Sequence, residues 1–201
     1  MRSRAAASVL SNAGFKEVYN MSGGINAWNG LVASGPPEAG IAYFPDNEKP
    51  GKIVVLAWLM EEGARRFYNG VEEMLQDEKP VHLFKELGAA EVRHKARLVK
   101  LYKELFDSGA APGTSDPFST EGLSDVMESG MRISEALDWV KGKGIMEILD
   151  YSIAMETNSY DLYIKMEQRV KEKELKQVFS SLLHEEKDHL ERLVSLLEER
   201  V

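Results

Sequence analysis

Two Glu-x-x-His units stand 95 residues apart in the sequence, at Glu91–His94 and Glu186–His189. Residues three apart lie on one face of a helix, so each unit can present a carboxylate beside an imidazole. A further glutamate precedes each unit by 30 residues, at Glu61 and Glu156. Four carboxylates and two imidazoles together can hold two divalent metal ions inside a four-helix bundle. We therefore predict a two-metal centre whose ligands are these six residues.

The mixture of ligand types narrows the choice of metal. Two neighbouring divalent cations repel each other, and anionic carboxylates between them reduce that repulsion. Imidazole ligands favour iron over calcium or magnesium, which prefer shells of oxygen atoms. The chain has no cysteine, which argues against a structural zinc site. We expect two iron ions, with manganese or zinc able to take their place.

The two units belong to an internal repeat. A shift of 95 residues places 56–106 over 151–201, and 13 of the 51 aligned pairs are then identical. One identical pair is Tyr68 with Tyr163, each two turns after the upstream glutamate and on the same side of its helix. These tyrosines are candidates for hydrogen bonds to the metal ligands, or for core aromatic residues, and the sequence leaves both interpretations open.

The neighbours of the upstream glutamates separate them from ordinary surface residues. Glu61 and Glu156 each follow a run of apolar residues. A carboxylate in an apolar stripe is costly to bury unless it is paired or coordinates a metal. Other glutamates of these helices, such as Glu62, Glu72 and Glu167, are expected to form a solvated face.

Helical periodicity predicts the elements that position these ligands. Apolar residues recur at helical spacing in one short and four long segments, which are Lys52–Leu75, Val81–Phe106, Arg132–Val140, Ile145–Val170 and Glu174–Glu199. A segment with several Gly and Pro residues, from Ser108 to Gly130, separates the first pair of long helices from the second. We predict a mainly α protein with a ferritin-like four-helix bundle and one long crossover. An ordinary antiparallel bundle with a disordered loop is the alternative.

Composition excludes several classes of protein. The formal net charge of -8 argues against nucleic acid as a partner, because phosphate binding needs a basic surface. No stretch approaches the roughly 20 apolar residues that span a bilayer, so we predict a cytoplasmic protein with no membrane partner. The lack of cysteine excludes disulfides, iron–sulfur clusters and a thiol nucleophile within this chain.

Residues from about 50 to 201 resemble the ferritin-like domain of the rubrerythrin family, through the six candidate ligands. The resemblance implies a non-haem di-iron centre that reduces peroxide or dioxygen, often in a homodimer. In such a centre Glu91 and Glu186 would bridge the metals, Glu61 and Glu156 would each bind one, and the histidines would supply one nitrogen each. Rubrerythrins proper also carry a four-cysteine module that delivers electrons. Because this chain has no cysteine, we expect an external electron donor protein.

The opening residues resemble the C-terminal end of a rhodanese domain. Arg2-Ser3, an alanine-rich helix, a strand over Phe15–Asn20, Gly23-Gly24 and Trp28 carry this resemblance. We therefore predict a truncated rhodanese-like fragment with a linker at 1–38, and the di-metal bundle at 39–201. The resemblance implies that a catalytic cysteine loop would have preceded Met1. A chain without cysteine is not expected to be an active sulfurtransferase.

Three functions remain open on the sequence. The preferred one is a di-iron or di-manganese oxidoreductase of the rubrerythrin type, which acts in oxidative-stress defence. The alternatives are a ferroxidase or iron-handling protein without peroxidase turnover, and a non-enzymatic interaction module. Bound metal would argue against the interaction module, and donor-dependent consumption of peroxide would separate the first two functions.

Overall fold

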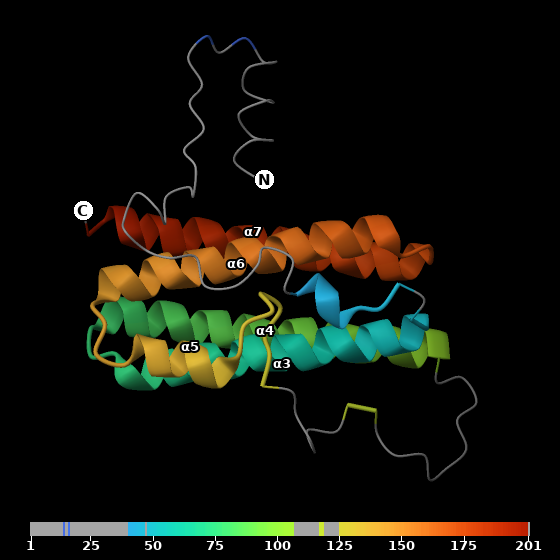
Figure 1. Ribbon diagram of the computed structural model, residues 1–201, viewed down its shortest axis with the longest axis horizontal. Coiled ribbons are helices and arrows are strands. Elements are labelled where there is room, and N and C mark those ends of the chain that lie inside the picture. The colour runs from blue at the N-terminus through green and yellow to red at the C-terminus, as the bar shows by residue number, and fades with distance from the viewer. Residues whose placement is uncertain are drawn as a thin grey trace. The chain divides into compact units, whose positions relative to one another are not determined.

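The computed structural model describes residues 14, 16, 40–46, 48–106, 117–118 and 125–200. Internal contacts divide the chain into two units, Met1–Pro36 and Pro37–Val201. The described elements belong to the second unit (Figure 1), and they are η1 (Ile41–Tyr43), α3 (Pro50–Met74), α4 (Glu78–Phe106), α5 (Ile133–Val140), α6 (Ile145–Arg169) and α7 (Lys173–Glu198). The prediction of a mainly α protein with four long helices and one short one is confirmed.

Predictions for the opening segment cannot be compared with this structure. The strand over Phe15–Asn20 and the rest of the rhodanese-like fragment lie outside the described residues, apart from Gly14 and Lys16. The boundary after residue 38 therefore stays a prediction. Within the described ranges no helix is long and apolar enough to cross a membrane.

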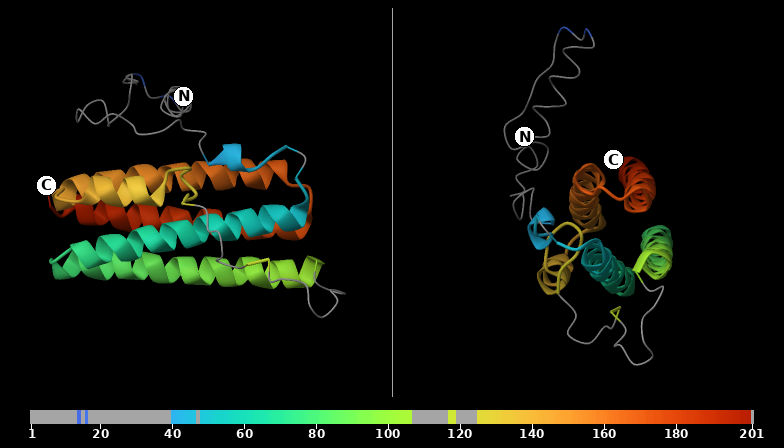
Figure 2. Two further views of the ribbon diagram at one scale, coloured as in Figure 1. Left: turned by 60° about the horizontal axis from the view of Figure 1, so that its bottom comes forward. Right: turned by 90° about the vertical axis from the view of Figure 1, so that its right-hand side faces the viewer.

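The long helices form two hairpins that pack into a bundle. Helix α3 pairs with α4 and α6 pairs with α7, and the hairpins also meet where α4 contacts α7. Figure 2 shows the four long helices end-on, with α6 and α7 on one side and α3 and α4 on the other. Local sequence sets the helix starts: Pro50 occupies the first turn of α3, where its fixed φ suits a helix and its missing N–H is not needed.

Two apolar clusters fill the bundle and fix the direction of each helix. One cluster joins the first halves of α3 and α7 to the second halves of α4 and α6. The other joins the remaining four halves. Helices α3 and α6 are therefore antiparallel, as are α4 and α7. Helix α4 ends at one end of the bundle and α6 begins at the other, so residues 107–144 form the long crossover that the sequence predicts.

The described part of the crossover packs closely on α3. Residues 125–132 form a small hairpin in which the N–H of Met127 donates to the carbonyl of Met131 at 3.0 Å. Gly130 ends its turn with a φ of 78°, a conformation that glycine adopts without strain. A Cβ atom at Gly63 on α3 would lie 2.3 Å from the carbonyl oxygen of Val126, so only glycine leaves room for this hairpin.

Replacing Gly63 with alanine tests this packing. Alanine favours a helix over glycine by about 1 kcal/mol, but the collision with the Val126 backbone should outweigh that gain. We expect Gly63→Ala to destabilise the metal-free protein by about 1–3 kcal/mol, which lowers its melting temperature by about 2–4 °C per kcal/mol. Gly88→Ala is the matched control, because its nearest neighbour is the Asn69 side-chain oxygen, which can rotate away. Equal melting temperatures for the two variants would contradict the close contact.

Candidate metal centre

The six predicted ligands lie at the middle of the four long helices, one glutamate on each helix and one histidine on each of α4 and α7. The apolar clusters described above end on either side of them, so the six side chains form a polar layer between two apolar layers. None of the six residues is more than 3% exposed. The helical periodicity of each segment places its ligands at this depth, because they share the inward face with core residues such as Ala57, Leu98 and Leu182.

The ligand atoms fall into two overlapping groups of four residues. Glu61 and His94 belong to the first group, Glu156 and His189 belong to the second, and Glu91 and Glu186 belong to both. Within each group all ligand atoms lie within 4.8 Å of one another. Two carboxylates shared by two such groups are what a pair of neighbouring cations requires, because each shared carboxylate has an oxygen available to each cation.

The two histidines face the carboxylates in matching ways. Nδ1 of His94 lies 2.9 Å from carboxylate oxygens of both Glu61 and Glu91. Nδ1 of His189 lies 3.3 Å from oxygens of both Glu156 and Glu186. The rings stack with their centroids 5.5 Å apart. Nδ1 is thus the nitrogen that each ring offers to the centre.

The repeated tyrosines cross from one hairpin to the other. Tyr68 on α3 donates its hydroxyl hydrogen to Glu156 on α6, and Tyr163 on α6 donates to Glu61 on α3. Burial and the carboxylates raise the pKa of both tyrosines well above the usual value of 10, so both remain donors. Of the two interpretations that the sequence leaves open, the structure places both tyrosines in hydrogen bonds to candidate ligands, and both rings also belong to the apolar clusters.

Several polar atoms of the centre have no hydrogen-bond partner within the described part of the chain. They are Oε2 of Glu91, Oε2 of Glu156 and Nδ1 of His189, all buried, and Glu91 Oε2 and His189 Nδ1 have only the ion-pair contacts between carboxylates and imidazoles given above. Leaving a buried polar atom unpaired costs about 1–3 kcal/mol. These atoms are crowded among carboxylates and imidazole nitrogens, a set of groups that a bound cation could satisfy together.

The charges of the ligands depend on one another when no metal is bound. Burial, and then the nearby Glu61 carboxylate, raise the pKa of Glu91 to about 8, although His94 opposes this shift. Burial also raises the pKa of Glu186. For Glu61, burial is outweighed by His94 and by hydrogen bonds, which lower its pKa to about 2. Burial opposes the charging of both histidines, but the carboxylates raise the pKa of each well above the usual value of 6.5. Bound protons therefore supply positive charge in place of metal.

The structure adds a buried carboxyl that the sequence does not reveal. Glu128 lies at the turn of the crossover hairpin, is 3% exposed, and its Oε1 has no partner among the described residues. Burial and then the carboxylates of Glu61, Glu91 and Glu186 raise its pKa well above the usual range. It lies near the centre without belonging to either group of four. No helical periodicity marks this residue, because it sits in the irregular crossover.

The prediction that Glu62 belongs to a solvated face is wrong. Glu62 is 4% exposed and accepts hydrogen bonds from Arg65, at 2.8 and 2.6 Å, and from Lys95. The Lys95 ammonium also lies 5.0 Å from the ring centroid of Trp58. Two cations thus replace the water that this carboxylate would otherwise need. Glu72 and Glu167 keep partial exposure.

Proton binding at the centre predicts how stability depends on pH. The pKa of Glu91 rises from 4.5 in the unfolded chain to about 8 in the folded protein. Its protonation therefore adds fully to the free energy of unfolding below pH 4.5, and this contribution is lost as the pH approaches 8. The raised pKa values of the two histidines also make stability fall as the pH rises above 6.5. We expect the metal-free protein to melt at a lower temperature at pH 8 than at pH 6, by about 2–4 °C for each kcal/mol lost.

Added Mn²⁺ should oppose this trend, because metal displaces the bound protons and therefore stabilises more at pH 8 than at pH 6. Glu91→Gln should flatten the pH dependence of the metal-free protein, whereas Glu104→Gln, on the exposed face of the same helix, should leave it unchanged. Thermal unfolding followed by circular dichroism measures both effects. A metal-free protein that gains stability from pH 6 to pH 8 would contradict this account.

Comparison with known proteins agrees with this geometry. The rubrerythrin family matches residues 52–197, which include all six candidate ligands and both tyrosines. A solved structure of a hypothetical protein from Pyrococcus furiosus is 25% identical, with a TM-score of 0.55 over 82% of this chain and 95% of that one. Curated proteins give no match. The comparisons give no support to the rhodanese resemblance of residues 1–38. The family match spans most of the chain, and this protein therefore belongs to the rubrerythrin family.

Proposed function

We propose that this protein is a di-iron or di-manganese oxidoreductase of the rubrerythrin type, which reduces hydrogen peroxide or dioxygen in defence against oxidative stress. The observation that carries this proposal is the sharing of Glu91 and Glu186 between two buried groups of four ligands. Two redox-active ions held by these residues would provide the one-electron chemistry that amino-acid side chains lack.

The residues that would hold the two ions follow from the two groups. Glu91 and Glu186 would bridge them, Glu61 and Glu156 would each bind one, and the histidines would bind through Nδ1. Four carboxylates would balance the charge of two divalent cations, which would offset the burial and the repulsion that raise the pKa of Glu91 and Glu186 in the metal-free protein.

The surrounding residues would keep the ligands in place and the site dry. Tyr68 and Tyr163 each hold one oxygen of a terminal carboxylate, so these carboxylates cannot swing away freely. The apolar clusters on both sides restrict the entry of water along the bundle axis. Reduction of one peroxide to two waters consumes two electrons and two protons. Because the chain has no cysteine, we propose that a separate donor protein supplies the electrons.

The remaining predictions for the whole chain stand as proposals beside this function. We propose that the protein acts as a homodimer, and that residues 1–38 form a rhodanese-like fragment without sulfurtransferase activity. The lack of sulfurtransferase activity follows because the chain has no cysteine that could carry a persulfide.

Removing both shared carboxylates should abolish metal binding. We expect the purified wild-type chain to contain about two iron or manganese ions, because the ligands form two groups of four. The double variant Glu91→Ala with Glu186→Ala should contain almost none, as measured by elemental analysis with circular dichroism to check the fold. The matched control is Glu104→Ala with Glu199→Ala, two exposed positions equivalent in the repeat. Full metal content in the first double variant would refute the site.

Turnover distinguishes the proposed enzyme from an iron-handling protein. Iron-loaded protein with an artificial electron donor should consume many equivalents of hydrogen peroxide, and the Glu91→Ala, Glu186→Ala variant should consume peroxide only at the background rate. Consumption that stops after about one equivalent per metal pair would favour ferroxidase or iron handling instead. Peroxide is followed directly, with the donor and free iron alone as controls.

A further inference from the structure

A glutamate outside the six ligands binds His94 on the side away from the centre. Oε2 of Glu185, the residue before Glu186 on α7, lies 3.0 Å from Nε2 of His94. A carboxylate can only accept a hydrogen bond, so the ring donates from Nε2. Nδ1, on the opposite side of the ring, is then the nitrogen that can bind a metal. Glu185 thereby selects the orientation and the tautomer that the centre requires.

Glu185 is itself held by an arginine near the surface. The Arg97 guanidinium pairs with its second oxygen and also donates to the hydroxyl of Ser181, at 3.1 Å. Side-chain exposure rises along this chain of contacts, from 0% at His94 to 22% at Glu185 and 42% at Arg97. The contact therefore links a buried candidate ligand to the protein surface.

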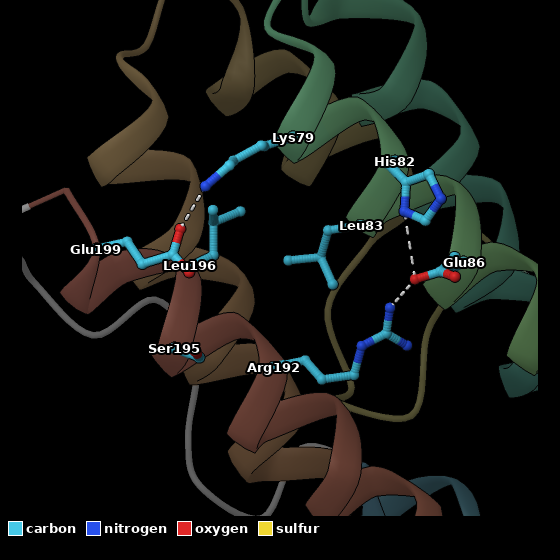
Figure 3. A pocket seen from close by; sticks show the side chains of 8 residues that line it. All are labelled: Lys79, His82, Leu83, Glu86, Arg192, Ser195, Leu196 and Glu199. Carbon is cyan, nitrogen blue, oxygen red and sulfur yellow. Dashed lines mark hydrogen bonds and ion pairs between the residues drawn. The ribbon is translucent and has the colours of Figure 1, made fainter.

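The other histidine of the repeat, His189, has no equivalent of Glu185. The position equivalent to Glu185 is Ala90, although the arginine is conserved between the copies as Arg97 and Arg192. Figure 3 shows that Arg192 pairs instead with Glu86, which also faces His82. Glu86 is equivalent to Ser181, one helical turn before the position of Glu185.

The second histidine consequently has a different environment. In the described part of the chain, every ion pair of His189 runs from Nδ1 to a candidate ligand, namely Glu91, Glu156 or Glu186. The groove that Figure 3 shows is lined by the Arg192–Glu86 pair and by Lys79 paired with Glu199, and it contains none of the six ligands. Glu86, the carboxylate that pairs with Arg192, lies in this surface groove, one helical turn away from the position equivalent to Glu185.

We propose that Glu185 is a positioning residue that makes the two halves of the metal centre unequal. It fixes His94 and increases the basicity of its ring, so the first metal ion binds in the half that contains Glu61 and His94. The second ion binds more weakly, beside Glu156 and His189. This inference rests on the proposed function, because the six residues must bind metal for the inequality to matter.

Titration of the metal-free full-length chain with Zn²⁺, followed by calorimetry, tests the proposal. We expect two binding steps of different affinity in the wild-type protein. Glu185→Gln should weaken the tighter step about 10–100-fold and leave the weaker step unchanged, because loss of such a partner typically has this effect on metal affinity. Glu191→Gln is the matched control, an exposed glutamate of the same helix that pairs with Lys187 at 3.3 Å. It should change neither step.

A second variant separates support of His94 from mere stabilisation of α4 against α7. Glu185→Ala combined with Ser181→Glu moves the carboxylate one turn along α7, where it can still pair with Arg97 as Glu86 pairs with Arg192. If Glu185 acts through His94, this variant should bind Zn²⁺ as weakly as Glu185→Gln. Recovery of the tight step would show that only the ion pair matters, and would overturn the proposal.

Nitrogen-15 NMR of the histidine rings gives an independent measurement. In the Zn²⁺-loaded wild-type protein, a slowly exchanging Nε2–H of His94 should be visible, and Glu185→Gln should abolish or shift that signal. Two equal Zn²⁺ affinities that Glu185→Gln does not change would refute the role of Glu185 and leave the proposed function intact. A wild-type chain that binds no Zn²⁺, iron or manganese would refute both.

Discussion

Four carboxylates in the dry middle of a helical bundle require positive charge between them, and much of this structure follows from that requirement. Each ionised carboxylate loses its hydration on burial, and mutual repulsion adds to the cost. The chain offers two imidazoles and two tyrosine hydroxyls at this depth, and within the described structure an oxygen of Glu91 and one of Glu156 still lack a hydrogen bond. Apolar layers on both sides hold the helices together despite this cost. Binding of metal at this layer would therefore be coupled to folding of the bundle.

The duplicated hairpin explains how a single sequence pattern produces two adjoining groups of candidate ligands. Antiparallel packing of the two copies brings each helix midpoint beside its counterpart, so one Glu-x-x-His unit faces the other across the bundle. Glu91 and Glu186 then belong to both groups, while Glu61 and Glu156 each belong to one. The tyrosines follow the same symmetry, because Tyr68 donates to Glu156 of the second copy and Tyr163 donates to Glu61 of the first.

The sequence predicts what depends on helical periodicity and on the repeat, and little beyond that. Spacing of three residues places Glu91 with His94 on one face, and the shift of 95 residues identifies the matching ligands. Glu128 could not be predicted, because the irregular crossover has no periodicity that would fix its direction. Glu62 looks like a surface residue until Arg65 and Lys95 are seen to converge on it. Such contacts depend on tertiary packing and on side-chain rotamers, which no local pattern encodes.

Several departures from the repeat lie around the half of the centre that contains Glu61 and His94. Glu185 contacts His94, whereas its counterpart Ala90 has no polar group. The partners Glu62 and Lys95 correspond to Thr157 and Leu190, so their ion pair also lacks a counterpart. The crossover hairpin, with Glu128, packs beside α3 at Gly63. A duplicated hairpin by itself would give two equivalent metal positions. Because each of these additions introduces charge or contact on one side only, the two groups of candidate ligands must differ in electrostatic environment even though they consist of the same residue types.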